Sequence, residues 1–386
     1  MSHVLIHDPE GDHNPYEPVS WARSPLRPTT SQRVRLGVRV VEPVGGVEVE
    51  WRSGVAAGSR SLDLEGDVWV GEIGPFKGSA RYRFVSDVGH ESRWFELDVL
   101  RWEQTSFAGL RVSGESLEAL CEVGALRLTP HGDVVDWEVV PASEEGVPGQ
   151  AGESGGWRAE IREGTLWLTS DAASLNLMPP EWCFDDHGDP VAVSLSWTLA
   201  PDERIFGTGE RFDRLDQRGR MPDVRVYEQY KQQRSRTYFP VPWLFSTRGY
   251  GLSIDSLRRV SFDLGSSESH LATVTIPDRG ARGRWYLGSP ERVLEAYVSD
   301  VGRPSPLPLW AYGPWMSGNE WDRDQRIREV VNKSLGEGVP ATVIVIEAWS
   351  DETTFYLFND TEHDPVAGAE PVPAAAMRHG GRWPDP

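Results

Sequence analysis

The sequence predicts a multidomain protein in which two β-rich regions are followed by an α/β segment. Two observations support this fold class. Short segments through most of the chain alternate apolar with polar residues, which is typical of half-buried antiparallel strands. Near the C-terminus, two apolar runs at 309–315 and 341–346 flank a segment whose apolar residues recur at helical spacing. That arrangement indicates a parallel β–α–β unit.

The first region, residues 1–100, is expected to be a small antiparallel β-sandwich of immunoglobulin-like type. Turns that contain glycine separate its predicted strands. Its alternating apolar positions are Val34, Leu36, Val38, Val40, Val47, Val49, Trp51, Tyr82 and Phe84. Carbohydrate binding and a packing or spacer role are both open for this module, because a fold alone does not give a function.

The second region, residues 101–305, continues with short β-like runs. Strands are predicted at 165–168, 191–195 and 252–254, and turn-forming clusters lie at 143–149 and 185–190. A short helix over 290–298 is expected to lead into the third region. We therefore predict a second, larger β-sandwich.

The third region, residues 306–386, is expected to begin a (β/α)8 barrel. The predicted helix starts at a capping box formed by Asp322 and Gln325 and ends before Pro340. Its apolar face consists of Ile327, Val330, Val331 and Leu335. The run 341–346 shows no alternation, as expected for a strand that helices cover on both faces. Two of the eight strands of such a barrel are therefore predicted in this chain.

Candidate site residues follow from this arrangement, because barrel enzymes hold their active sites at the carboxyl ends of the strands. Glu347, Trp349 and Asp351 come directly after the second predicted strand, and Trp315 ends the first. An indole offers a flat apolar partner for a sugar ring. The alternatives are a chance placement of acidic residues in a generic α/β domain, core packing for any of the 17 Trp, and turn capping for Asp351.

Five motifs, in order, give a more specific indication. They are 206–212 with 215–219, 238–243, 248–252, 288–294, and 307–317 with 319–321. Together they resemble glycoside hydrolase family 31, the α-glucosidase and α-xylosidase family, over roughly residues 160–386. The resemblance implies that the second region is a sandwich like that of galactose mutarotase.

The resemblance also implies a reaction. The family hydrolyses O-glycosyl bonds with retention, using a nucleophilic carboxylate and an acid/base carboxylate about 5–5.5 Å apart. It places them after barrel strands four and six, and assigns neither role to a residue before Pro386. We therefore expect a fragment of a retaining α-glycosidase, truncated early in its barrel and inactive alone. The alternative is a non-catalytic carbohydrate-binding or interaction protein, and transglycosylase and lyase chemistry stay open.

Two glutamates fall at substrate positions by the same resemblance. Glu347 matches a carboxylate that accepts hydrogen bonds from hydroxyls of the sugar to be cleaved, and Glu228 lies in a sandwich loop that reaches the same sugar. Charge-assisted hydrogen bonds of this kind are about twice as strong as neutral ones. Many relatives carry Asp at both places, and Glu228 could equally be a solvated loop residue.

Composition limits the partners. The formal net charge of −20 argues against nucleic acid and anionic membranes, and a neutral α-glycoside is indifferent to it. The sequence contains no apolar run of membrane-spanning length and no signal peptide, so a cytoplasmic location is expected. Cys121 and Cys183 are expected to be buried reduced thiols.

No cofactor and no metal are expected. Residues 207–209 form only a partial glycine fingerprint, and 185–189 lack the spacing of a calcium loop. His7, Asp12 and His13 could meet around a metal, but histidines near an N-terminus are more often simply exposed.

Overall fold

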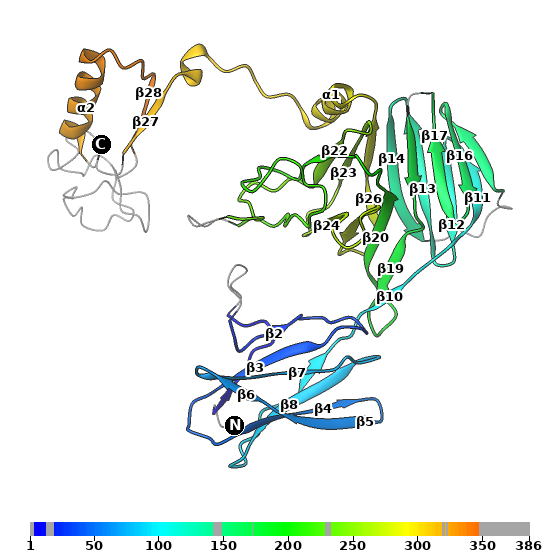
Figure 1. Cartoon of the computed structure of the whole chain (residues 1–386), viewed down its shortest axis with the longest axis vertical. Helices are drawn as coiled ribbons and strands as arrows, with labels where there is room; N and C mark the ends of the chain where they lie inside the picture. Colours follow the sequence, from blue (N-terminus) through cyan, green and yellow to red (C-terminus); the bar gives the residue numbers. More distant parts are fainter. Residues whose placement is uncertain are drawn as a thin grey trace, which may run out of the picture. The chain divides into compact units, whose positions relative to one another are not determined.

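The computed structural model describes residues 4–12, 19–141, 149–171, 173–227, 233–318, 321 and 323–346. The chain divides into two compact units, 1–301 and 302–386. The first unit consists of strands with one helix, and the second contains a helix beside a short pair of strands (Figure 1). In the described ranges, neither helix could span a lipid bilayer.

The first sandwich is built from two antiparallel sheets around one core (Figure 1). Predicted alternation is confirmed here: Val34, Leu36 and Val38 are buried, as are Tyr82 and Phe84. One sheet has the order β1-β3-β7-β6, with β2 paired to β3, and the other has the order β5-β4-β8-β9. The strands are β1 (Leu5–Ile6), β2 (Arg23–Ser24), β3 (Val34–Val40), β4 (Val47–Ser53), β5 (Ala56–Ser61), β6 (Asp63–Glu65), β7 (Val68–Ile73), β8 (Ala80–Ser86) and β9 (Phe95–Leu97). The immunoglobulin-like type stays a prediction.

His7, near the N-terminus, is not exposed, contrary to the sequence expectation. His7 is 9% exposed, and its ring packs against the Phe84 and Phe95 rings. Nδ1 lies 2.6 Å from the Gly37 carbonyl oxygen, and Nε2 lies 2.8 Å from the Tyr82 hydroxyl. The ring therefore fastens the N-terminal segment to the core of the first sandwich.

The second sandwich packs a nine-stranded sheet against an eight-stranded one. The first has the order β10-β19-β20-β18-β17-β16-β15, extended by β25 and β24 beside β20. Its strands are β10 (Arg101–Glu103), β15 (Ala151–Ser154), β16 (Trp157–Arg162), β17 (Thr165–Thr169), β18 (Ser174–Leu177), β19 (Glu181–Phe184), β20 (Pro190–Thr198), β24 (Ser261–Leu264) and β25 (Leu271–Ile276). The strands predicted at 165–168 and 191–195 are confirmed as β17 and part of β20.

The eight-stranded sheet has the order β11-β12-β13-β14-β26-β23-β22-β21. Its strands are β11 (Phe107–Ser113), β12 (Ser116–Cys121), β13 (Gly124–His131), β14 (Val134–Pro141), β21 (Ile205–Gly207), β22 (Trp243–Ser246), β23 (Tyr250–Ile254) and β26 (Ala281–Leu287). Between the sheets, the Trp197 indole meets the Trp285 ring edge-on and donates a hydrogen bond to the Tyr250 hydroxyl. Large buried aromatic side chains therefore join the two layers.

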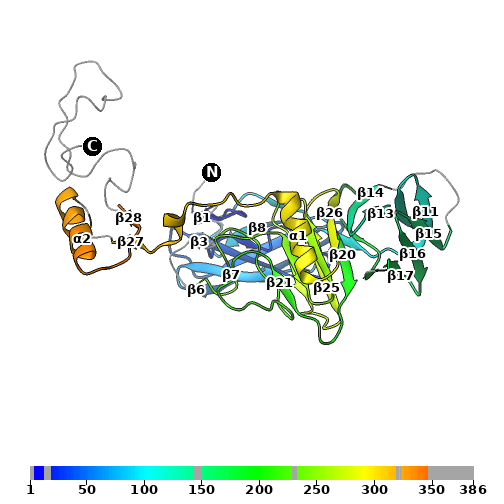
Figure 2. The ribbon, with the colours of Figure 1, turned by 90° about the horizontal axis from the view of Figure 1, so that it is seen from above.

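Helix α1 (Pro290–Val301) packs against β22, β23 and β26 of this sheet. Figure 2 shows it beside β26. Val293 is fully buried, and the Tyr297 ring stacks on Trp243 with centroids 4.4 Å apart. The predicted helix at 290–298 is confirmed and extends to Val301. Both cysteines are free and buried as predicted, and burial raises the pKa of each thiol to about 11.

The second unit contains one parallel β–α–β arrangement. Strand β27 (Trp315–Ser317) pairs in parallel with β28 (Val343–Val345), and helix α2 (Asp324–Gly336) connects them. The predicted helix and the parallel pairing are therefore confirmed, although β28 is shorter than the predicted 341–346. A complete or partial barrel remains a prediction.

The first strand starts later than predicted. Residues Leu309–Tyr312 form a 3-10 helix, η1, rather than the start of a strand. The Ala311 amide donates to the Pro308 carbonyl, and Pro314 has no amide hydrogen to give to a sheet. The apolar run alone could not separate helix from strand.

The predicted capping box is also wrong. The N-cap of α2 is Arg323, whose side chain forms no capping hydrogen bond. The side-chain amide of Gln325 donates to the Glu329 carboxylate and not to the backbone at the start of the helix. Asp322 lies outside the described residues.

Candidate functional site

The carboxyl ends of β27 and β28 lie side by side at one edge of the parallel pair. Trp315 pairs with Val343 and Ser317 pairs with Val345. Glu347 follows Val345 by two residues in the sequence. Parallel strands of this kind present their following residues at a common edge, where α/β enzymes bind ligands.

Of the five predicted site residues, only Trp315 lies in the described part of the chain. Its predicted position at the end of a strand is wrong, because Trp315 is the first residue of β27. The side chain is exposed, and its indole nitrogen donates to the Ala311 carbonyl oxygen at 3.1 Å. Glu228, Glu347, Trp349 and Asp351 lie outside the described residues.

A tryptophan that the sequence analysis did not select lies at the carboxyl end of β27. The Trp321 amide donates to the Gly318 carbonyl at 3.0 Å, and a Cβ at position 318 would come within 2.8 Å of the Trp321 indole. Glycine therefore lets the half-buried indole lie directly on the backbone just beyond the strand. The short spacing between glycine and tryptophan was the available sequence signal.

A second group of residues organises the sandwich segment 207–242, which contains Glu228. The Arg211 guanidinium donates to the main-chain oxygens of Thr208, Asp223 and Ser235 at 2.5, 2.8 and 2.8 Å. It also donates to the Thr208 hydroxyl at 3.0 Å. Burial lowers the pKa of Arg211, and Asp213 and Asp223 oppose that change by their charge. One side chain therefore ties together three separate stretches of this segment.

Gly207 and Gly209 allow close backbone packing within this segment and do not form a phosphate-binding loop. Gly209 has a φ of +93°, and a Cβ there would lie 2.1 Å from the Phe239 carbonyl oxygen. Gly207 has a φ of +113° and approaches the Trp243 carbonyl similarly. Both positions exclude a side chain, which explains the partial glycine fingerprint without a dinucleotide.

We expect Arg211→Met to expose the 207–242 segment to protease and to lower the free energy of unfolding by about 2–3 kcal/mol, because buried carbonyls lose their donors. Limited trypsin or chymotrypsin digestion with mass mapping measures the first effect, and urea denaturation measures the second. Arg214→Met is the control, since the Arg214 side chain is exposed. Equal cleavage rates in the two variants would contradict the assignment.

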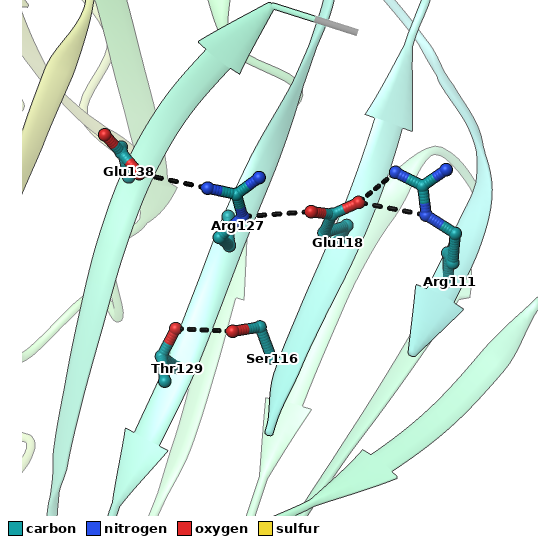
Figure 3. A network of polar contacts seen from close by, with 6 residues as sticks. All are labelled: Arg111, Ser116, Glu118, Arg127, Thr129 and Glu138. Carbon is teal, nitrogen blue, oxygen red and sulfur yellow. Dashed lines mark hydrogen bonds and ion pairs between the residues drawn. The ribbon is translucent and has the colours of Figure 1, made fainter. Parts of the chain in front are cut away.

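The outer face of the eight-stranded sheet carries a row of charges across four strands. Figure 3 shows Arg111, Glu118, Arg127 and Glu138 in sequence on β11, β12, β13 and β14. The Glu118 side chain is 4% exposed and accepts hydrogen bonds from both flanking arginines. Burial alone raises the pKa of Glu118, but those hydrogen bonds outweigh burial and lower it.

The same face continues into a groove of about 650 Å³ beside α1. Arg284 forms ion pairs with Asp136 at 2.8 Å and with Asp300 at 3.0 Å. The Tyr286 hydroxyl donates to Asp300, and burial raises the pKa of Tyr286 to about 12. These charges hold one another in place, so the groove presents no pair of free carboxyl groups. The described residues also contain no cluster of three or more His, Cys, Asp or Glu side chains suited to a metal.

Comparisons with known proteins agree with the motifs. Residues 143–263 match the model of the glycosyl hydrolase 31 N-terminal galactose mutarotase-like domain. An isomaltosyltransferase of Sporosarcina globispora is 35% identical over 48% of the chain and 18% of its own length. A 1,3-alpha-isomaltosidase of Kribbella flavida is 26% identical over 99% of the chain and 49% of its own length.

A solved structure supports the fold over the whole chain. The cycloalternan-forming enzyme from Listeria monocytogenes matches 99% of this chain and 41% of its own, with a TM-score of 0.77 and 24% identity. The chain thus spans about half, or less, of the length of these relatives. The predicted resemblance to glycoside hydrolase family 31 is confirmed.

Proposed function

We propose that this chain, whose second sandwich is a glycosyl hydrolase 31 N-terminal galactose mutarotase-like domain, forms the substrate-side portion of a retaining α-glycosidase. The supporting observation is the parallel pairing of β27 with β28, which Glu347 follows two residues after the end of β28. A carboxylate just beyond a parallel strand suits the binding of sugar hydroxyls at the active-site edge of a barrel.

The proposed substrates are α-glucosides that contain isomaltosyl units. The names of two curated relatives point to this class, because one is an isomaltosyltransferase and the other is a 1,3-alpha-isomaltosidase. The second of these aligns with nearly the whole chain. An α-xyloside is the other substrate class that the family resemblance implies.

The roles of this chain's residues are binding and orientation. Glu347 and Glu228 accept hydrogen bonds from hydroxyls of the sugar, and Arg211 holds the segment that carries Glu228. Trp315, Trp349 and Asp351 are secondary candidates for contact with the sugar. The nucleophile and the acid/base of a retaining mechanism are two further carboxylates. The family resemblance assigns neither to residues 1–386, so the chain by itself is proposed to lack turnover.

The purified 386-residue chain is expected to bind isomaltose without cleaving it. Calorimetric titration measures binding, and chromatography of glucose released overnight measures cleavage. Glu347→Gln should weaken binding by about tenfold, because a charge-assisted hydrogen bond is worth roughly 1.5–3 kcal/mol.

Glu337→Gln is the matched control, since Glu337 is the exposed C-cap residue of α2. Turnover of isomaltose or of an aryl α-glucoside above the blank would refute the non-catalytic assignment. Equal affinity of the two variants would refute the role of Glu347.

A further inference from the structure

The first sandwich contains a cleft that the proposed glycosidase function does not use. It has a volume of about 460 Å³ and lies where the β4–β5 hairpin meets the end of β7 and the turn that follows. Residues of both sheets and of the segments next to β3 and β7 line it: Arg33, Trp51, Arg60, Glu72, Phe76 and Lys77. Small-ligand sites commonly have volumes of about 300–1,000 Å³, so the cleft can hold a monosaccharide.

Aromatic rings form a rigid wall of this cleft. The Trp51 and Phe76 rings meet edge-on with centroids 5.3 Å apart. The backbone of β5 lies flat on the indole, because a Cβ at Gly58 would come within 2.6 Å of a Trp51 ring carbon. Trp51 is therefore fixed in place while its side chain remains only half-buried. A fixed, partly exposed indole is a suitable surface for the apolar face of a pyranose.

The charges around the cleft are mainly positive. Arg33, Arg60 and Lys77 are exposed, and none of them forms an ion pair with a described carboxylate. Arg60 donates to the main-chain oxygen of Glu72 at 3.0 Å, which fixes its position at the rim. Glu72 supplies the one negative charge among the lining residues. Three cations against one anion stand out in a chain whose formal net charge is −20.

We propose that this cleft binds a sugar ring that carries an anionic group, either a carboxylate or a phosphate. The indole packs on the ring, and the cations at the rim neutralise the anion. Guanidinium groups suit this role because their planar donors match the oxygens of both groups. A local excess of positive charge on an acidic protein attracts such a ligand while the rest of the surface repels it. This binding is separate from the α-glycoside site and independent of the proposed glycosidase function.

Titration calorimetry of the 386-residue chain tests the proposal with glucuronate, glucose 6-phosphate and glucose. At least one anionic sugar is expected to bind about tenfold or more tightly than glucose, which corresponds to about 1.4 kcal/mol. The sugar that binds more tightly identifies the anionic group. The affinity should fall as ionic strength rises, because the cations are exposed.

Three variants locate the binding. Lys77→Gln and Arg33→Gln should each weaken the binding of the anionic sugar by several-fold, because each removes one exposed charge. Arg52→Gln, at an exposed arginine that does not line the cleft, should leave it unchanged. Equal affinity for glucose and the anionic sugars overturns the proposal, as does an equal effect of all three variants. Inorganic phosphate or acetate binding as tightly as the sugars would mean an adventitious ion only.

Discussion

Replacing Glu118 with alanine is expected to lower the free energy of unfolding of the second sandwich by about 3 kcal/mol, because it breaks a buried ion pair. The Arg111 side chain is 13% exposed and loses its ion pair with Glu118. The Arg127 side chain is 38% exposed and can recover water, which keeps the effect near the lower end of the usual range. Urea denaturation monitored by circular dichroism measures the change.

Glu138 provides a matched control in the same row of charges. Its side chain is 48% exposed, and its contact with Arg127 is 3.3 Å long (Figure 3). Exposed pairs contribute about 0.2–1 kcal/mol, so Glu138→Ala should be nearly neutral. If Glu118→Ala cost no more than Glu138→Ala, the buried carboxylate would not stabilise the sheet as argued.

The first sandwich is expected to lose about 3 kcal/mol of stability as the pH falls from 6.5 to 4, because a pKa difference of one unit corresponds to 1.36 kcal/mol. Burial lowers the pKa of His7 from 6.5 to about 4, while hydrogen bonds to Gly37 and Trp21 oppose the change. Arg23 lowers this pKa further and Asp8 raises it. Between these pH values His7 is protonated in the unfolded chain but stays mostly neutral in the folded chain. Stability is therefore full above pH 6.5 and falls progressively below it.

Urea denaturation at several pH values between 4 and 7.5 measures the effect of His7. His7→Gln removes the titrating ring but keeps a side-chain donor for the Gly37 carbonyl, so this pH dependence should disappear. His131→Gln is the control, because the His131 side chain is 53% exposed and belongs to the second sandwich. An unchanged slope in His7→Gln would show that other groups cause the acid sensitivity.

The sequence was most predictive where the local pattern decides burial. Alternation places Val34, Leu36 and Val38 on one face of a strand, and that face is buried in the folded protein. The pattern of short β-like runs likewise located β17 and part of β20. It did not resolve residues 309–312, because an apolar run between two prolines satisfies both a helical turn and a strand.

The roles of Arg211 and Glu118 depend on contacts between residues on different strands and loops, which local sequence patterns do not show. Arg211 was part of a recognised motif, yet its partners Asp223 and Ser235 are set by the path of the loop. Glu118 lies between Leu117 and Ala119, and nothing in that local pattern distinguishes it from an exposed charge. Its burial comes from arginines on neighbouring strands, whose side chains cover it only once the register is fixed.

The pairing of β14 with β26 joins residues 134–139 to 281–286, which are far apart in the chain. All the strands from β15 to β25 are made between these two partners. During synthesis the eight-stranded sheet therefore cannot be completed until the ribosome has passed Leu287. Until then, β14 lacks its partner β26 and is an unpaired edge strand. Residues 143–263, which match the family model, leave out strands β10 to β14, β25 and β26, so they contain neither sheet of the second sandwich in full.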